Sequence, residues 1–471
     1  MEQNMVSCKP IDDPSIPAGR IQHLNDSEMK GKTYILYWMQ QSQRATDNHA
    51  LAYAVHLANR CRQPLLVVFG LTDGYPGANL RHYAFMLEGL QETQATLRTK
   101  GIRMVIRKGK PPAVALDLAG EASAIVCDRG YLRHQRKWRR EVARFADCPV
   151  VQVESDLVVP VETASGKAEY AARTIRPKIH KQLAKYLAPL KPDPIGRSSL
   201  DLPVGSLDPG NVDEVLRGLD IDRKIEPVSR FFKGGSSQAK ARFDDFLQSR
   251  LNGYAKHSNQ PQTDDISQMS PYLHFGQISP SYLALKVVNA AGIGDEDREG
   301  FLEQLIVRRE LAANFAFYTP DYDAYSCLPS WAQETLREHE GDRRDYLYTR
   351  GQLAGARTHD AYWNAAMAEM RLTGFMHNYM RMYWGKKILE WSKTPRQGFR
   401  TVLALNNAYF LDGRDPNSFA GAAWVFGLHD RPWKERPVFG KVRYMAASGL
   451  ERKCDIQGYV TKVASLAACT G

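Results

Sequence analysis

The stretch TGFMHNYMRMYWGKKILEW, residues 373–391, is the most informative about the fold, and it predicts one helix of about five turns. Apolar side chains recur at every fourth position: Met376, Met380, Trp384 and Ile388. Arg381 lies on the same face as this stripe, and a buried guanidinium needs a carboxylate partner or an anionic ligand. Downstream, LDGRDPNSFAGAAW (411–424) offers Asp412 and Asp415 in a Gly/Pro turn. An ordinary core helix is the alternative interpretation of the first stretch.

Working outward, the segment ISQMSPYLHFG, residues 266–276, has the pattern of a helix start. Ser267 and Ser270 precede Pro271, and Pro favours the first turn of a helix. Hydroxyl and N–H groups at such a start can bind a pyrophosphate. A simple helix cap explains the same residues.

The first half of the chain alternates short β-rich runs with helical patterns. The β-rich runs lie at 34–39, 65–71, 102–107, 124–128 and 150–154, and the helical patterns near 47–60, 79–100, 111–120 and 131–146. Asp47 and Asn48 are suited to cap the first helix. The alternation predicts a doubly wound parallel sheet, a Rossmann-like α/β fold. A GxGxxG motif is absent, so a dinucleotide site of that type is not indicated.

The second half is predicted to be helical. Helical periodicity dominates at 238–252, 280–290, 299–315, 361–371, 373–391 and 396–407. Before it, the Pro-, Gly- and Ser-rich run at 191–211 is typical of a linker. We therefore expect four parts: a flexible N-terminus (1–30), an α/β domain (31–160), an interdomain linker (161–230) and a helical domain (231–471).

The composition bounds the class of protein. The chain has 471 residues, of which 43% are hydrophobic and 24% charged, as in globular proteins. No run of about 18 apolar residues predicts a membrane span, and the first 30 residues lack the apolar core of a secretory signal. Seven cysteines without a CxxC pair argue against a metal site and for the reducing cytoplasm or nucleus. A net charge of +11 favours a polyanionic partner such as nucleic acid.

Six motifs, in order, resemble one family. They are LYWMQQSQRATDN (36–48), SPYLHFGQIS (270–279), RTHDAYWNAA (357–366), MHNYMRMYWGKKILEW (376–391), LDGRDPN (411–417) and HDRPWKERPVFGKVRYM (429–445). They closely resemble the class II cyclobutane pyrimidine dimer photolyases of the photolyase/cryptochrome family. The resemblance implies that the α/β domain is an antenna module and that the helical domain binds FAD. It leaves open a second antenna chromophore of deazaflavin or folate type in the N-terminal domain.

The resemblance also implies which residues bind FAD. The expected phosphate-binding residues are Tyr254, Ile266, Ser267, Gln268, Met269 and Ser270. Arg381 and Asp412 match the family's salt bridge beneath the isoalloxazine, and Asp415 belongs to the same expected set. Asn406 matches the asparagine that faces flavin N5, where an amide can donate or accept a hydrogen bond. A helix C-cap is the alternative role for Asn406, and the neighbouring Asn407 replaces an expected aspartate, which would weaken a local polar contact.

The implied activity is light-driven DNA repair by a monomer acting on duplex DNA that contains cyclobutane pyrimidine dimers. Excited FADH⁻ passes an electron to a flipped-out dimer, the cyclobutane ring splits and the electron returns. Oxidised FAD would first be reduced through Trp384 and Trp363, with Tyr348 as a branch; plain core packing is the alternative for these rings. The implied lesion and DNA contacts are Gln304, Arg308, Met382, Trp424, Arg431, Trp433 and Arg443.

One position departs from the family pattern. The family has two successive acidic residues where this chain has Glu303 and Gln304, and the second touches the dimer. Glu303 is not expected to substitute, because it lies about 100° around a helix. Weaker natural repair, an engineered substitution and a lost repair function remain three explanations for Gln304. The rival functions are a cryptochrome-like FAD photoreceptor without repair activity and an unrelated basic flavoprotein.

Overall fold

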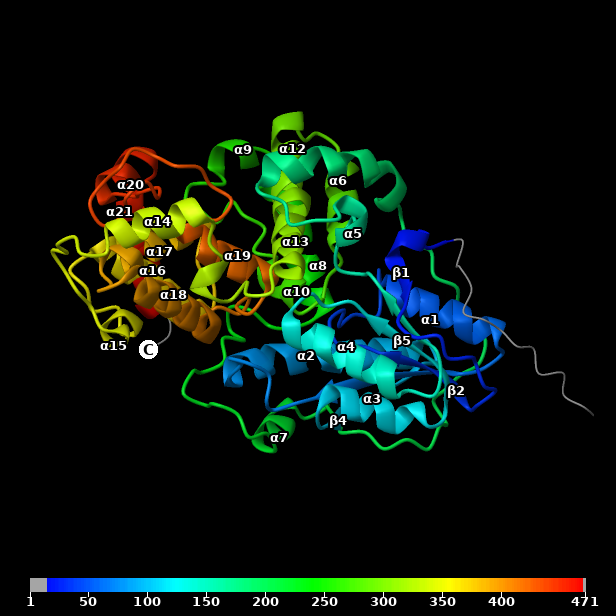
Figure 1. Cartoon of the computed structure of the whole chain (residues 1–471). Helices are drawn as coiled ribbons and strands as arrows, with labels where there is room; N and C mark the ends of the chain where they lie inside the picture. The colour runs from blue at the N-terminus through cyan, green and yellow to red at the C-terminus, as the bar shows by residue number, and fades with distance from the viewer. Residues whose placement is uncertain (1–14, 469–471) are drawn as a thin grey trace, which may run out of the picture.

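The computed structural model describes residues 15–468, so the flexibility expected for residues 1–14 lies outside the described part. The strands are β1 (Ile21–His23), β2 (Tyr34–Trp38), β3 (Leu65–Leu71), β4 (Arg103–Lys108), β5 (Ala122–Asp128) and β6 (Val150–Val153). They form one sheet in the order β1-β6-β5-β2-β3-β4, in which every pair is parallel except β1 with β6. The predicted parallel sheet is confirmed (Figure 1).

Helices cover both faces of this sheet because alternate residues of each strand point to opposite sides. Ile35 and Tyr37 pack with α1 (His49–Arg60) and α2 (Leu80–Thr99). Leu36 and Trp38 pack with α3 (Pro111–Ala119) and α4 (Arg133–Phe145) on the other side. Asn48 caps α1, as predicted, by accepting a hydrogen bond from the backbone of Leu51. The sheet is therefore doubly wound.

The expectation of a flexible N-terminus does not hold for residues 18–23. A single 3₁₀ turn, η1 (Ala18–Arg20), leads into β1, whose three residues pair with β6. The Arg20 side chain is buried and donates to the backbone carbonyls of Leu157 (2.9 Å) and Val158 (2.7 Å). A strand of three residues is too short to show an alternating pattern in the sequence, so β1 is recognised only from its pairing with β6.

The segment 161–230, predicted as a linker, contains three helices. They are α5 (Val161–Ala164), α6 (Ala172–Tyr186) and α7 (Val212–Arg217). Between α6 and α7 the chain runs beside β4, where the Arg103 side chain donates to the carbonyls of Leu200 (2.9 Å) and Val204 (2.8 Å). The domain limits 31–160, 161–230 and 231–471 stay a prediction.

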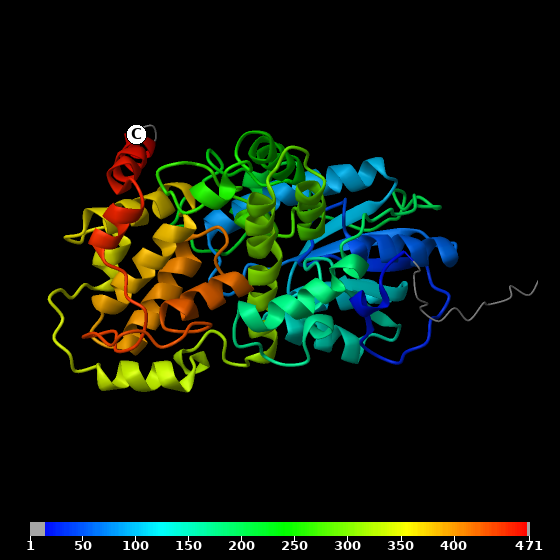
Figure 2. The same cartoon turned by 90° about the horizontal axis from the view of Figure 1, so that it is seen from above.

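The rest of the chain is helical, as expected (Figure 2). Its helices are α8 (Ser236–Ser249), α9 (Tyr254–His257), α10 (Ser270–His274), α11 (Pro280–Val288), α12 (Asp295–Leu302), the π turn η2 (Glu303–Arg308), α13 (Arg309–Tyr318), η3 (Tyr325–Cys327), α14 (Ser330–Glu338), α15 (Arg350–Ala354), α16 (Ala361–Thr373), α17 (Asn378–Glu390), α18 (Pro395–Tyr409), α19 (Pro416–Val425), α20 (Ala447–Lys453) and α21 (Ile456–Ala468). None of the described helices is long and apolar enough to cross a membrane.

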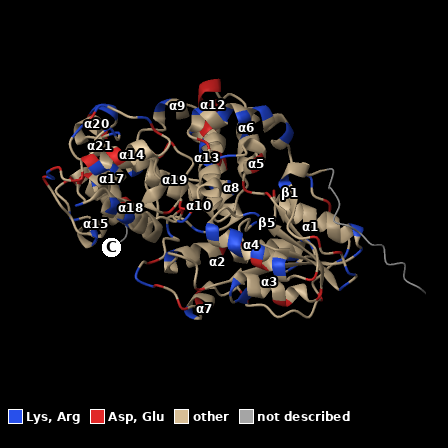
Figure 3. Cartoon of the chain, viewed as in Figure 1, with Lys and Arg blue, Asp and Glu red and all other residues tan. Residues whose placement is uncertain are grey.

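The rod formed by α12, η2 and α13 lies between the sheet domain and the helices from α14 to α21 (Figures 1 and 2). α13 packs against α19, and η2 packs against α6. Acidic residues gather at the start of α12, where their negative charge interacts favourably with the helix dipole (Figure 3). Basic residues run along α4 in the same view. This rod carries Gln304 and Arg308, the residues expected at the lesion.

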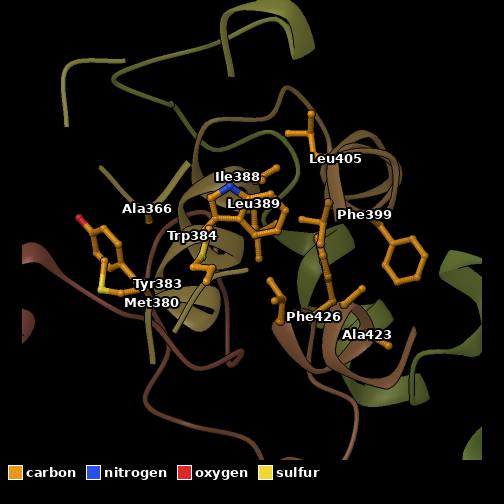
Figure 4. Packing of buried hydrophobic residues seen from close by; sticks show 14 of the residues in the cluster. Ala366, Met380, Tyr383, Trp384, Ile388, Leu389, Phe399, Leu405, Ala423 and Phe426 are labelled. Carbon is orange, nitrogen blue, oxygen red and sulfur yellow. The ribbon is translucent and has the colours of Figure 1, made fainter. Parts of the chain in front are cut away.

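The stretch 373–391 is not one helix, which corrects the prediction. α16 ends at Thr373, Gly374 has a left-handed φ of 74°, and α17 begins at Asn378. A Cβ atom at Gly374 would lie 2.9 Å from the Leu411 side chain, so a neighbouring turn packs into the break. The apolar stripe itself is confirmed: Met380, Trp384 and Ile388 are buried on α17 (Figure 4). Met376 lies before α17, yet its side chain is fully buried in the same cluster.

Candidate functional site

Arg381 of α17 and Asp412 in the turn after α18 form a bidentate ion pair. Nη1 lies 3.0 Å from Oδ1, Nη2 lies 3.0 Å from Oδ2, and Nε donates to the carbonyl of Met376 (2.9 Å). The guanidinium also lies 4.0 Å from the ring centre of Phe410. Asp412 is almost fully buried, whereas the Arg381 side chain is 22% exposed. The planar fork is therefore fixed in orientation and keeps one side accessible.

Asn406, near the end of α18, is held by two side chains. Its Nδ2 donates to Oδ1 of Asn407 (3.0 Å) and to Oγ of Ser418. The helix C-cap is Phe410, so the alternative role of Asn406 as a cap is wrong. Asn407 also accepts from the backbone N–H of Arg414 (3.0 Å). The asparagine that replaces an aspartate thus keeps these local polar contacts.

Asp415 joins two of the predicted segments. Its Oδ1 caps α19 by accepting from the backbone N–H of Asn417 (2.8 Å), and its Oδ2 lies 3.2 Å from Nδ1 of His274 on α10. Burial raises the pKa of this carboxyl, but the hydrogen bond from His274 and nearby positive charge outweigh it and bring the pKa to about 2. Asp415 is therefore an anchor for α10 and stays ionised.

The segment around 254–270 begins and ends at helix starts. Tyr254 opens α9 and is buried against Phe301, with ring centres 5.5 Å apart, and burial raises its pKa to about 12. Ser270 opens α10 with Pro271 in the first turn, which confirms the predicted helix start. Gln268 has a left-handed φ of 55°. The remaining predicted residues are Ile266 and Ser267, half-buried, and Met269, buried.

A continuous row of contacts joins this segment to the Arg381–Asp412 pair. Gln268 accepts a hydrogen bond from Arg242, whose guanidinium lies 4.5 Å from the ring of Phe232. Phe232 contacts Phe375, with ring centres 5.7 Å apart, and Arg381 lies 5.4 Å from the Phe375 ring. Two parts of the site that are more than 100 residues apart in sequence therefore share one wall.

The donors on this wall suit an anionic ligand that contains rings. Ser267 and Ser270 offer hydroxyls, and Arg381 offers the accessible side of its guanidinium. The indole N–H of Trp384 is buried and has no acceptor among the described residues. An unsatisfied buried donor is costly, so a ligand oxygen or nitrogen that accepts from it would remove the penalty. The donor set fits the phosphates and the ring carbonyls and nitrogens of a flavin nucleotide.

Aromatic side chains run from Trp384 toward the surface. Trp363 is fully buried and its Nε1 donates to the backbone carbonyl of Trp384 (3.0 Å). The Trp363 ring lies 5.6 Å from that of Trp391, which lies 5.4 Å from Tyr348. Sequence reasoning named three of these rings and missed Trp391, although it lies seven residues, about two turns, after Trp384. The four residues make a connected path.

Exposed side chains form a second surface around Trp433. The ring is 40% exposed and has two guanidinium groups near it, those of Arg431 (5.1 Å from the ring centre) and Arg443 (4.9 Å), while its Nε1 donates to Asp430 (3.2 Å). The two arginines hold the ring by cation–π contacts and place positive charge beside it. Trp424 and Met382 are half-buried. Arg431, Arg443 and Trp433 thus form one connected group on the surface.

Gln304 and Arg308 are exposed on the π turn η2, which interrupts the predicted α-helix at 299–315. Glu303 points to arginines instead, with distances of 2.8 Å to Arg176 and 3.2 Å to Arg308. Burial lowers the pKa of His429 to about 4, and Arg308 adds to this, so η2 lies near the loop that precedes Trp433. Among the described residues, no hydrogen bond or ion pair joins Gln304 to that loop.

A cavity opens at the carboxyl ends of the strands, between the sheet domain and α10. Its empty space is about 800 Å³, part of it open to solvent. Lining residues include Trp38, Phe69, Tyr75, Asp128, Trp138 and His274. This edge of a doubly wound sheet is the usual place for a ligand, and the aromatic lining suits a flat ring system.

Known proteins resemble the whole chain. The DNA photolyase family model matches residues 35–195. A deoxyribodipyrimidine photo-lyase from Methanothermobacter thermautotrophicus is 49% identical, over 96% of this chain and 99% of its own length; one from Arabidopsis thaliana is 39% identical, over 93% and 90%. A crystal structure of a class III photolyase from Agrobacterium tumefaciens shares the fold, with a TM-score of 0.72 at 19% identity over 93% of this chain and 87% of that one. The chain belongs to the DNA photolyase family.

Proposed function

We propose that this protein is a class II photolyase that uses FAD and blue light to split cyclobutane pyrimidine dimers in DNA. The observation that carries the proposal is the bidentate Arg381–Asp412 pair. Phe410 connects this pair to Trp384, whose indole N–H has no acceptor among the described residues: Arg381 lies over the Phe410 ring, and the Trp384 ring contacts it at 6.1 Å. The high identity to photo-lyases along nearly the whole chain supports the same activity.

The bound FAD supplies light absorption and one-electron chemistry. The residues of this chain position it and tune it. The segment 254–270 binds the phosphates, and the positive charge of Arg381 stabilises negative charge on the reduced ring. Asp412 holds that guanidinium in place. Asn406, oriented by Asn407 and Ser418, would lie at flavin N5; because both of its Nδ2 hydrogens are already donated, its Oδ1 would serve there as acceptor.

The aromatic path returns electrons to the cofactor after it has been oxidised. Trp384 is the ring nearest the site wall, and Trp363, Trp391 and Tyr348 follow it toward the surface. Direct ring contacts support short transfer steps along this order. Under this proposal Trp391 is a required member of the path.

Duplex DNA with a flipped-out dimer is the proposed substrate of a monomeric enzyme. The exposed Trp433 would fill the space left by the flipped bases, and Arg431 and Arg443, which contact its ring, would meet the phosphates. Trp424 and Met382 contact the dimer, and Gln304 and Arg308 meet it from η2. A net charge of +11 favours this partner.

The cavity at the strand ends is the proposed site of a second, light-harvesting chromophore of deazaflavin or folate type. The aromatic rings of Trp38, Phe69 and Trp138 suit a flat pigment. Its position between the sheet and α10 brings such a pigment close to the helical domain, as energy transfer requires.

The decisive experiment is repair of an oligonucleotide containing one thymine dimer by the reduced protein under blue light. We expect intact thymines to appear in the light and none to appear in the dark. A protein that binds FAD and is photoreduced, but restores no thymine, would contradict the repair function and favour the photoreceptor.

A further inference from the structure

Tyr348, at the outer end of the aromatic path, is hydrogen-bonded to a histidine. Its phenolic oxygen lies 2.8 Å from Nδ1 of His359, and the backbone N–H of His359 donates to the same oxygen (3.0 Å). The two residues are 11 positions apart, on the loops before α15 and α16. The pair therefore comes from tertiary structure and not from a local turn.

The second hydrogen bond is compatible with a phenol that donates to the imidazole. The phenolic oxygen accepts from the backbone N–H of His359 and still has its own proton to donate, and this proton is assigned to the bond with Nδ1. In that arrangement the imidazole carries its own proton on Nε2. His359 is exposed, so a proton received on this ring has a route to solvent.

The imidazole is held in position from two sides. Tyr346 stacks on it, with ring centres 3.6 Å apart and planes 17° apart, and Trp391 contacts it at 5.3 Å. The next residue, Asp360, caps α16 by accepting from the backbone N–H of Trp363 (3.0 Å). The histidine is thus fixed between two aromatic rings beside the helix that carries the path.

We propose that His359 is the proton acceptor for oxidation of Tyr348, an inference that rests on the proposed photoreduction. One electron passes from the Tyr348 phenol to the oxidised indole of Trp391, and the phenolic proton passes to Nδ1. The products are a neutral indole, a neutral phenoxyl radical and an imidazolium. An external thiol then reduces the phenoxyl radical by one electron, and the proton returns from the imidazolium to the oxygen.

The proton transfer makes Tyr348 a favourable last electron donor in the aromatic path. A phenol that loses an electron becomes a very strong acid, so oxidation without a base is unfavourable, whereas an indole can be oxidised without losing its proton at once. A base within hydrogen-bond distance typically accelerates such a step by about 10²–10⁴-fold. Separating electron and proton onto two side chains also slows the return of the electron to Trp391.

The pH response of the pair depends on the groups that face it. Tyr346 and Tyr348 face His359 from their loop, and Asp360 follows it on its own segment. From α17, Lys387 lies over the Trp391 ring at 5.8 Å and is paired with Glu390 (2.8 Å). Asp360 is engaged by Trp363 and by the hydroxyl of Tyr383. Lys387, Glu390 and Asp360 are therefore held in pairs or caps, while Arg357, on the same segment as His359, is exposed.

The test is flash photolysis of the FAD-loaded protein, with transient absorption of indole and phenoxyl radicals. In the unchanged protein the phenoxyl radical should form more slowly in D₂O, and its yield should fall in acid, because a protonated imidazole cannot accept a second proton on Nδ1. His359→Gln and His359→Phe should slow its formation by about 10²-fold and remove the pH response. His180→Gln, at an exposed histidine on α6, is the matched control.

A measurement without the cofactor separates chemistry from folding. Nitrogen-15 NMR of the apoprotein should show His359 as a neutral ring with an accepting Nδ1, and Tyr348→Phe should shift that signal. The inference is overturned if His359→Gln forms the phenoxyl radical at the unchanged rate and pH profile, or if no phenoxyl radical forms in the unchanged protein while indole radicals do. Absence of all photoreduction would instead overturn the proposed function, and this inference with it.

Discussion

At the scale of single residues, the geometry of Arg381 makes a sharp prediction. Arg381→Lys keeps the positive charge but loses the two-point contact with Asp412, because an ammonium is a point charge without a fork. We expect the dissociation constant for FAD to rise by about tenfold to a hundredfold, or roughly 1–3 kcal/mol. Titration of the apoprotein with FAD measures it. Arg400→Lys, at an exposed site on α18, should change nothing.

Two tryptophans should separate photoreduction from DNA binding. Trp391→Phe interrupts the path between Trp363 and Tyr348, so photoreduction with an external thiol should slow at least about tenfold while dimer binding persists. Trp433→Phe should do the reverse, with weaker binding to dimer-containing DNA and unchanged photoreduction. The same phenotype in both variants would contradict the assignment of the two rings to separate tasks.

For Gln304 we predict a substitution that increases the repair yield. Its amide can hold a thymine carbonyl but lacks the carboxyl of the family pattern, so Gln304→Glu should raise the repair yield per absorbed photon. A change of about 1–2 kcal/mol in an interaction made during the reaction corresponds to up to some tenfold in rate. The two proteins are compared at equal absorbed light on one oligonucleotide. No improvement would mean that residue 304 does not act on the dimer.

At the scale of the element, the break between α16 and α17 depends on one glycine. Gly374→Ala forces a residue with a Cβ atom into a φ of 74° and against the Leu411 side chain. We expect a loss of about 1–3 kcal/mol in the free energy of unfolding, measured by denaturant titration. Gly421→Ala, inside α19 where nothing lies within 4 Å, should be stabilising by about 0.5–1 kcal/mol.

The helices and strands could be predicted from the sequence only in part. The strands at 65–71 and 150–154 are predictable to within a residue, because both segments are rich in the valine and other apolar residues that favour buried strands. The break at Gly374 was missed because its cause, the packing of Leu411, is 37 residues away. The Arg381–Asp412 pair followed only from resemblance, and Trp391 was missed because an aromatic path exists only once helices pack.

At the scale of the whole molecule, Glu310 couples stability to pH. It lies fully buried on α13, its Oε1 accepts from Val158 (2.8 Å) and Val159 (2.9 Å) of the sheet domain, and burial raises its pKa to about 8. Between about pH 4.5 and 8 the folded protein therefore keeps the Glu310 proton, whereas the unfolded chain releases it. The contribution of Glu310 to the free energy of unfolding is fully present in acid and is lost as the pH rises toward 8.

Glu310→Gln mimics the protonated carboxyl and should remove this dependence. Relative to the unchanged protein, the variant should gain stability between about pH 5 and pH 8, by on the order of a few kcal/mol. Thermal unfolding across this range measures the gain, and Glu299→Gln, at an exposed position, is the control. A constant difference at all pH values would show that Glu310 is ionised in the folded protein.

The short strand β1 and the chain beside β4 have a shared consequence. A sheet normally ends in a row of free N–H and C=O groups to which another chain can add. At one end of the sheet the edge strand β1 has only three residues, and at the other the backbone N–H of Leu207 donates to the carbonyl of Ile106 (2.8 Å). A very short edge strand and an edge partly covered by the chain both disfavour the addition of a strand from a second copy.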